Sequence, residues 1–229
     1  MHLIILVLAL LSSTVLASPY DRVIDTAAKR HGVDPYVLRA IAQVESQKNP
    51  WTFNADGEGF RLQSAQQAIQ ALHALNRSPW MLKIRGNDNS VHREFFTNEH
   101  AALAAFTVLN NTKPNWRGLV LRTDNKKEVK EGQARIRKLW MLNTDIGIAQ
   151  INYRYHGGGL PVQHWFDYSF NLDYAARLLA EHKKHTGNDL DAAGRYHSKT
   201  QRHREAYMRK ILPAYNREKR NAQNIIATR

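Results

Sequence analysis

The stretch DPYVLRAIAQVES, residues 34–46, decides how the first part of this chain is organised. Asp34 is a preferred helix N-cap residue, and Pro35 takes the first helical position, where its missing amide donor has no cost. Apolar residues then recur at helical spacing, which predicts a short helix with one face turned inward. Asn49-Pro50 follows and predicts the end of that helix.

Glu45 lies on the inward face of this helix, because counting back by helical steps reaches Ala42, Ile41 and Leu38. A carboxyl group in that position loses hydration, which disfavours the ionised form and raises the pKa. Such a group can serve as a general acid near neutral pH. The alternative is a solvated glutamate at a helix end, which is how most glutamates occur.

The composition is typical of one globular domain that meets anionic partners. The 229 residues are 43% hydrophobic, which is enough for one sizeable core. A formal net charge of +13 favours nucleic acid, phospholipid surfaces or the acidic peptidoglycan wall. The sequence contains no cysteine, so it has no disulfide framework, thiol nucleophile or cysteine-ligated zinc site.

The first 17 residues predict a secretory signal peptide. Residues 3–16 are apolar or small, too few to span a bilayer comfortably, and they lead into Ala17-Ser18. We expect cleavage after Ala17 and a periplasmic or extracellular protein. The alternatives are a buried N-terminal helix or an anchor retained in the membrane, because the leader has His2 but no Lys or Arg. Export favours the wall or a lipid surface over nucleic acid as the partner.

The rest of the chain predicts a mainly helical domain over residues 18–216. A loop or short hairpin is expected at residues 51–59, beside Glu45, and an inserted lobe of poorly defined structure at residues 77–142. The basic tail, residues 217–229, has too few apolar residues to pack and is expected to fray. Helices are expected at residues 20–31, 64–76, 99–109, 169–185, 189–196 and 201–216, the last bent or ended near Pro213, and a short strand at residues 119–121.

Two downstream segments, together with Glu45-Ser46, favour a catalytic role for Glu45 over a solvated helix end. They are Asp145-Ile146-Gly147-Ile148-Ala149-Gln150-Ile151-Asn152 and Ala192-Ala193-Gly194-Arg195-Tyr196-His197-Ser198. The ordered set resembles the Glu-Ser, Gly-Leu-Met-Gln and Ala-Tyr-Asn signatures of soluble-type lytic transglycosylases. The likeness is closest to the small wall-opening enzymes of conjugation and type IV secretion machines, and it covers residues 20–76 and 144–215.

The resemblance implies a mainly α, goose-lysozyme-like fold and a monomer that acts on peptidoglycan without a cofactor. Family members cleave the β-1,4 bond between N-acetylmuramic acid and N-acetylglucosamine and leave a 1,6-anhydro end. Glu45 would protonate the leaving oxygen and then deprotonate the 6-hydroxyl group. The residues expected around the glycan are Ser46, Gly147, Gln150, Asn152, Tyr196 and His197.

The sequence departs from the family pattern at two positions. Ala149 stands where the signature usually has Met, and His197 where it usually has Asn. Both departures concern the sugar subsite and leave Glu45 unaffected. Tyr207 fits a family tyrosine near the C-terminus, although His203 stands where an acidic residue is expected one helical turn before it.

Two alternatives stay open at this point, and a metal site is weighed and not expected. Asp56 or Glu58, in the loop after the Glu45 helix, could supply the second carboxylate of a goose-type hydrolase. A non-enzymatic basic module could bind a polyanion, although the 33 Lys and Arg are scattered and no nucleic-acid motif accompanies them. His182 and His185 have the spacing of zinc ligands but lack an obvious third one, so no metal site is expected.

Overall fold

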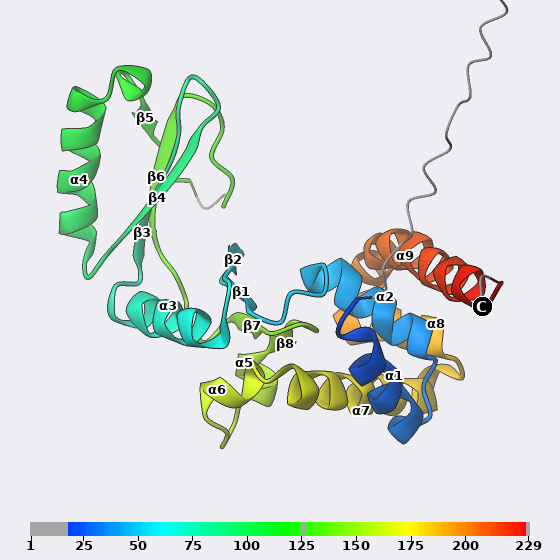
Figure 1. Ribbon diagram of the computed structural model, residues 1–229. Helices are drawn as coiled ribbons and strands as arrows, with labels where there is room; N and C mark the ends of the chain where they lie inside the picture. Colours follow the sequence, from blue (N-terminus) through cyan, green and yellow to red (C-terminus); the bar gives the residue numbers. More distant parts are fainter. Residues whose placement is uncertain (1–17, 125–126, 228–229) are drawn as a thin grey trace, which may run out of the picture.

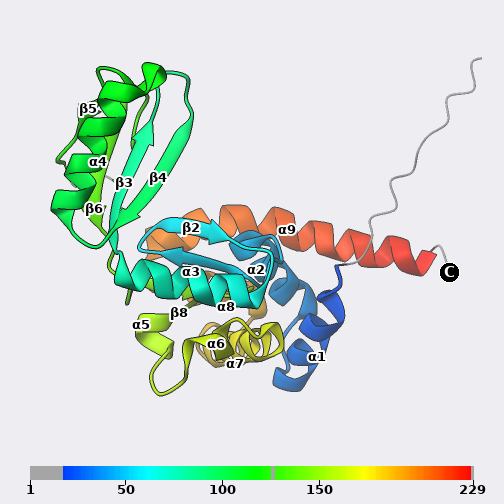
Figure 2. The same cartoon turned by 60° about the vertical axis from the view of Figure 1, so that its left-hand side comes forward.

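The protein has a helical body and a smaller lobe built on a second sheet. The computed structural model describes residues 18–124 and 127–227, and the predicted leader lies outside these residues. The body and the lobe each enclose their own apolar cluster. In Figures 1 and 2 the lobe, with α4 on one side of its sheet, projects away from the helices of the body. Among the described residues, no helix combines the length and apolar character needed to cross a membrane.

The body is formed by helices from both ends of the chain. Helix α1 (Asp21–His31) ends at Gly32 in the left-handed conformation, and the Asp34 carboxylate caps α2 (Pro35–Ser46) by accepting the Tyr36 amide at 2.8 Å. Helix α2 packs on α9, and α7 packs on both α1 and α8. The helices predicted for the body are present. Those near the C-terminus are α7 (Tyr168–Thr186), α8 (Asp189–His197) and α9 (Gln201–Ala227).

A small antiparallel sheet connects the end of α2 to the middle of the chain. Strands β1 (Thr52–Ala55) and β2 (Glu58–Arg61) form the predicted hairpin. Strand β1 also pairs with β7 (Thr144–Ile146), which pairs with β8 (Ile151–Asn152). The Glu45 segment and residues 144–152, about a hundred positions apart in the sequence, thus share one region of the body. Two short helices follow, α5 (Tyr153–His156) and α6 (Val162–Trp165).

The expected lobe contains a four-stranded sheet, of which the sequence predicted only one strand, at residues 119–121. After α3 (Ala65–Arg77), which Ser64 caps as predicted, the strand order is β4-β3-β6-β5. Helix α4 is longer than the predicted segment. The lobe cluster contains Leu82, Ile84, Leu119 and Ala134. The elements of the lobe are β3 (Trp80–Arg85), β4 (Val91–Phe96), α4 (Glu99–Thr112), a 3-10 turn (Pro114–Trp116), β5 (Val120–Leu121) and β6 (Gln133–Lys138).

The acids of the β1–β2 hairpin hold the lobe against the body. Glu58 is 3% exposed, and its carboxylate lies 2.9 Å from the Lys83 ammonium and 3.2 Å from the Arg137 guanidinium. Asp56 lies 2.7 Å from Arg137 and 3.0 Å from Lys127. Burial alone would raise the pKa of Asp56, but hydrogen bonds, the one from Lys127 foremost, lower it. Both acids are therefore engaged by basic side chains of the lobe, so neither is a free second carboxylate of the kind that a goose-type hydrolase needs.

Glu58→Gln is expected to lower the free energy of unfolding by about 3 kcal/mol, because it leaves the partly buried Lys83 ammonium without its carboxylate and removes one of the two carboxylates that pair with Arg137. Urea denaturation followed by tryptophan fluorescence measures this change. Glu128→Gln, an exposed acid of the same lobe, is the matched control and is expected to stay within about 0.5 kcal/mol of the parent. Equal stabilities for the two variants would contradict the account of the hairpin.

The basic C-terminal segment is helical, contrary to expectation. Helix α9 continues through Pro213 to Ala227. Glu218 is 6% exposed and lies 2.9 Å from Lys48, whose ammonium also donates to Asp21 at 2.7 Å. Composition suggested a frayed tail because it counts apolar residues, whereas the start of this segment is held by the ion pairs of Glu218 with Lys48 and Arg39.

Candidate functional site

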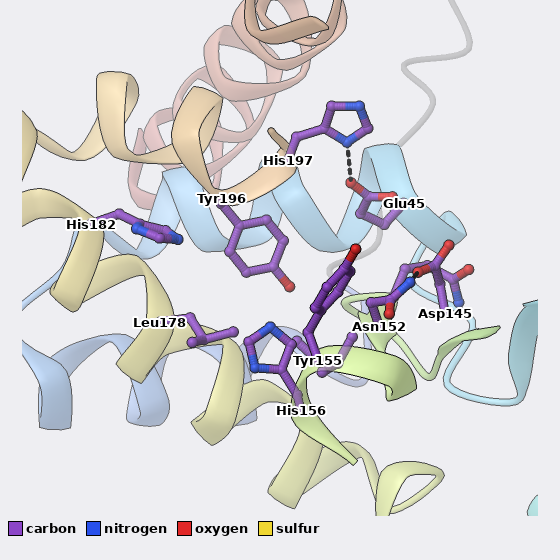
Figure 3. A pocket seen from close by; sticks show the side chains of 11 residues that line it. Glu45, Asp145, Asn152, Tyr155, His156, Leu178, His182, Tyr196 and His197 are labelled. Atoms are coloured by element: carbon purple, nitrogen blue, oxygen red, sulfur yellow. Dashed lines mark hydrogen bonds and ion pairs between the residues drawn. The ribbon is translucent and has the colours of Figure 1, made fainter. Parts of the chain in front are cut away.

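A cavity of about 290 Å³ lies between the end of α2, the β7–β8 segment and α8. It brings together five of the seven residues predicted for the site. Figure 3 shows the side chains of four of them, Glu45, Asn152, Tyr196 and His197, around the cavity. Polar and aromatic groups dominate its wall, as expected of a site for a polar ligand. Its lining residues are Glu45, Asp145, Gln150, Ile151, Asn152, Tyr155, His156, Leu178, His182, Tyr196 and His197.

Glu45 carries a carboxyl group whose proton affinity is suited to acid catalysis near neutral pH. Its side chain is only 19% exposed, because α2 turns it toward the interior one residue before the helix ends. The pKa of Glu45 is raised from 4.5 to about 7, mainly by burial. The nearby Asp145 contributes to this rise, whereas Tyr207 and Lys210 oppose it. At neutral pH a large fraction of the Glu45 side chain therefore still holds its proton.

Tyr196, at the end of α8, fixes the turn that faces Glu45. Its hydroxyl group donates to the Ala149 carbonyl at 2.7 Å. Burial first, and then the neighbouring Glu45 carboxylate, raise the pKa of Tyr196 well above 10. The hydroxyl group therefore stays protonated and keeps residues 147–150 at a fixed distance from α8. The sequence predicted the proximity to Glu45 but not the bond to Ala149.

His197 and Tyr207 form a stacked pair beside Glu45. Their rings are 4.3 Å apart and 2° from parallel, and His197 Nδ1 lies 3.9 Å from Glu45 Oε1 (Figure 3). Burial, with the positive charge of Lys210, lowers the pKa of His197, so the ring is neutral at pH 7. The buried Tyr207 hydroxyl interacts with the Glu45 carboxyl group without reaching regular hydrogen-bond geometry.

Gln150 and Asn152 lie on the opposite wall of the cavity. Gln150 has a positive φ of 49°. Its side-chain nitrogen, Nε2, donates to the Gly147 carbonyl at 2.8 Å and to the Thr52 carbonyl at 3.1 Å. Asn152 donates to Asp145 at 2.7 Å. Both side chains are therefore held in place by the protein before any ligand arrives.

Ser46 and Gly147 do not line the cavity, although we expected both to contact the glycan. Ser46 is 1% exposed, and its hydroxyl group donates to the Ile148 carbonyl at 2.7 Å, which ties α2 to the 147–150 turn. Gly147 has a φ of +82°, and a Cβ atom there would lie 2.5 Å from the Trp165 carbonyl oxygen. The close approach at Gly147 is therefore to protein and not to a ligand. Both residues support the 147–150 turn from the side that faces away from the cavity.

Three residues important for this geometry were missed as site residues or not assigned a role. Asp145 lines the cavity, and strand alternation in β7 could have predicted that it faces away from Thr144 and Ile146. Tyr207 was noted, but its contact with Glu45 was not predicted. Asn171, in α7, makes side-chain hydrogen bonds to backbone groups of Ala149, Ile146 and Trp165, and no pattern in the sequence identifies these partners.

Comparison with known proteins finds no family model, no curated protein sequence and no solved structure that matches this chain. The likeness to lytic transglycosylases therefore rests on the three sequence segments and on the cavity that they form. The Glu45-Ser46, 145–152 and 192–198 segments meet around this cavity even though they are far apart in the sequence. Any function assigned to the chain has to be argued from that geometry.

Proposed function

We propose that this protein is a lytic transglycosylase that cleaves the β-1,4 bond between N-acetylmuramic acid and N-acetylglucosamine in peptidoglycan. The observation that carries the proposal is the Glu45 carboxyl group, with its pKa raised to about 7, inside a cavity lined by polar and aromatic side chains. The order of the three segments along the chain supports the same family. The mainly helical body is compatible with a lysozyme-like fold, which belongs to this proposal.

The proposed reaction uses Glu45 twice. The protonated carboxyl group gives its proton to the glycosidic oxygen as the C1–O bond breaks, and the acetamido group of the sugar supports the positive charge at C1. The resulting carboxylate then takes the proton of the 6-hydroxyl group, whose oxygen forms the new bond to C1. No water is consumed, and Glu45 ends the cycle protonated as it began. Tyr207 and neutral His197 would orient the carboxyl group through the contacts described above.

The surroundings of the site support a wall substrate. The net charge of +13 suits a polymer with peptide carboxylates, and the predicted leader would take the protein to the periplasm or the cell exterior. A role in opening the wall for a secretion or conjugation machine, by a monomer, is part of the proposal and follows from the sequence resemblance alone. A basic module without enzymatic activity does not account for a partly buried carboxyl group that lines a cavity of polar and aromatic side chains.

Hydrolysis at the same cavity is the second candidate, and Asp145 is the observation that favours it. Asp145 lines the cavity with Glu45, and burial raises its pKa although the hydrogen bond from Asn152 lowers it. As a base it would take a proton from water, which would then attack C1 and leave a reducing end. Asp56 and Glu58 are not suited to that role, because their carboxylates are engaged by the lobe.

The pH dependence of cleavage tests the proposed acid. We expect kcat/KM for release of muropeptides from purified sacculi to fall above about pH 7, by about tenfold per pH unit, as Glu45 loses its proton. Binding of the Glu45→Gln variant to the same sacculi over the same pH range separates a loss of binding from a loss of chemistry. A rate that is constant up to pH 9 would contradict the assignment of Glu45 as the acid.

A further inference from the structure

An aromatic and basic rim continues the wall of the cavity outward. Tyr155 lines the cavity, yet its side chain is among the most exposed aromatic groups of the described residues, at 71%. In Figure 3 its ring stands at the cavity with the hydroxyl group on the side of Glu45. The guanidinium carbon of the exposed Arg154 lies 5.5 Å from the Tyr155 ring centre and 4.4 Å from that of Trp140, which is 47% exposed. We call Trp140, Arg154 and Tyr155 the rim.

The rim is attached to the candidate site through Asn152. The Asn152 side chain accepts the Arg154 amide at 3.1 Å and donates to Asn143 at 3.3 Å. Asn143 closes the turn that begins at Trp140, with its amide 2.9 Å from the Trp140 carbonyl oxygen. Because Asn152 also donates to Asp145 inside the cavity, the rim and the cavity wall form one continuous surface.

The charge at the rim is available to a ligand. Within residues 18–124 and 127–227, Arg154 meets the ring faces of Trp140 and Tyr155 and no carboxylate, unlike Arg39 and Arg137, which pair with Asp25 and Asp56. A guanidinium group that stacks on a ring keeps its N–H edge free, and that edge matches a carboxylate in a bidentate pair. Exposed tryptophan and tyrosine rings also offer flat apolar faces on which the C–H face of a sugar can be buried.

We propose that the rim binds a carboxylate-bearing unit of the glycan strand that leaves the cavity, with Arg154 pairing with the carboxylate and Trp140 and Tyr155 packing on the sugar. This inference rests on the proposed function. Two sources of the carboxylate exist in peptidoglycan. In strands with peptide stems, the lactyl carboxyl group is consumed in an amide bond and the carboxylates are those of the peptides. In strands freed of peptides by an amidase, the lactyl carboxylate itself is exposed.

Binding assays in the Glu45→Gln background test the rim without relying on cleavage. Three probes are used: strands with stems, amidase-treated strands, and chitohexaose, which has no carboxylate. Arg154→Gln is expected to weaken binding to a carboxylated strand by roughly five- to tenfold and to leave chitohexaose binding unchanged. The strand type that shows the loss identifies the carboxylate. Trp140→Ala is expected to weaken binding to all three probes.

Arg117→Gln is the matched control, because it removes one exposed positive charge from the lobe, between the 3-10 turn and β5. It is expected to bind every probe as the parent does. Equal binding by the Arg154→Gln variant and the parent would overturn the proposal, and so would a loss that includes chitohexaose or that Arg117→Gln reproduces. Digestion of sacculi by the unmodified protein is measured separately. If digestion occurs and Arg154→Gln does not change binding, the proposal for the rim fails while the proposed function stands. If Arg154→Gln weakens binding as expected but no digestion occurs, the rim binds the glycan and the proposed cleavage is wrong.

Discussion

Glu45→Gln is expected to lower the rate of peptidoglycan cleavage by roughly a thousandfold while the fold stays intact. The amide has nearly the same shape as the carboxyl group and cannot transfer a proton as an acid does. Release of soluble muropeptides from purified sacculi measures the loss, and circular dichroism shows whether the helices are retained. Glu128→Gln, which changes an exposed acid of the lobe in the same way, is expected to cleave at the parent rate.

The Glu45→Gln variant is also expected to be more stable than the parent, but only at higher pH. Below pH 4.5 the carboxyl group is protonated in both the folded and the unfolded chain, so Glu45 contributes no pH dependence. Between pH 4.5 and about 7 the folded protein keeps the proton that the unfolded chain loses, so the parent loses stability as the pH rises. The advantage of the variant should grow by about 3 kcal/mol over this range and then stay constant.

Urea denaturation of both proteins at pH 4, 6 and 8 measures that difference. A variant that is inactive but gains nothing at pH 8 would show that Glu45 is not desolvated as described. A variant that gains stability but cleaves normally would show that a desolvated Glu45 is not the acid. The two readouts therefore test the environment of Glu45 and its role separately.

Asn171→Leu is expected to lower both stability and activity, because Asn171 holds the cavity wall from behind. Its side chain is fully buried, accepts the Ala149 amide at 2.9 Å and donates to the carbonyl groups of Ile146 and Trp165 at 2.9 and 3.0 Å. Leucine has a similar volume but leaves these backbone groups unsatisfied, which should cost about 3–5 kcal/mol.

Thermal unfolding and the cleavage rate at a temperature well below the transition test this role. The activity loss should persist where the variant is fully folded, because the turn that positions Gln150 and Ala149 is released. Asn216→Leu, an exposed site on α9, is the matched control and is expected to change neither value. Full activity of a folded Asn171→Leu protein would contradict the view that this turn positions the site.

The sequence predicts the helical body well, because its signals are local. Asp34, Gly32 and Gly187 define helix ends at the positions found, and the inward position of Glu45 follows from helical spacing alone. The lobe sheet could not be predicted in this way. Strand β3 pairs with β6, whose residues follow about fifty positions later, and nothing in either strand identifies the other as its partner.

The roles within the site were predicted less completely than its location. Ser46 and Gly147 belong to the correct segments, but spacing cannot say whether a side chain faces a cavity or the protein behind it. Tyr207 and Glu218 contact the Glu45 region through the packing of α9 on α2, which is a long-range contact. Asn171 was missed because its importance lies in three bonds to backbone groups, which carry no residue-specific signal.

The mass of the released muropeptides tests the central claim most directly. Digestion of purified sacculi by the unmodified protein, followed by mass spectrometry, is expected to give products with 1,6-anhydro ends, each lighter by one water than the corresponding hydrolysis product, because the 6-hydroxyl group and not water attacks C1. Release of reducing ends alone would contradict the transglycosylase mechanism and assign hydrolysis, with Asp145 as the candidate base, to this cavity.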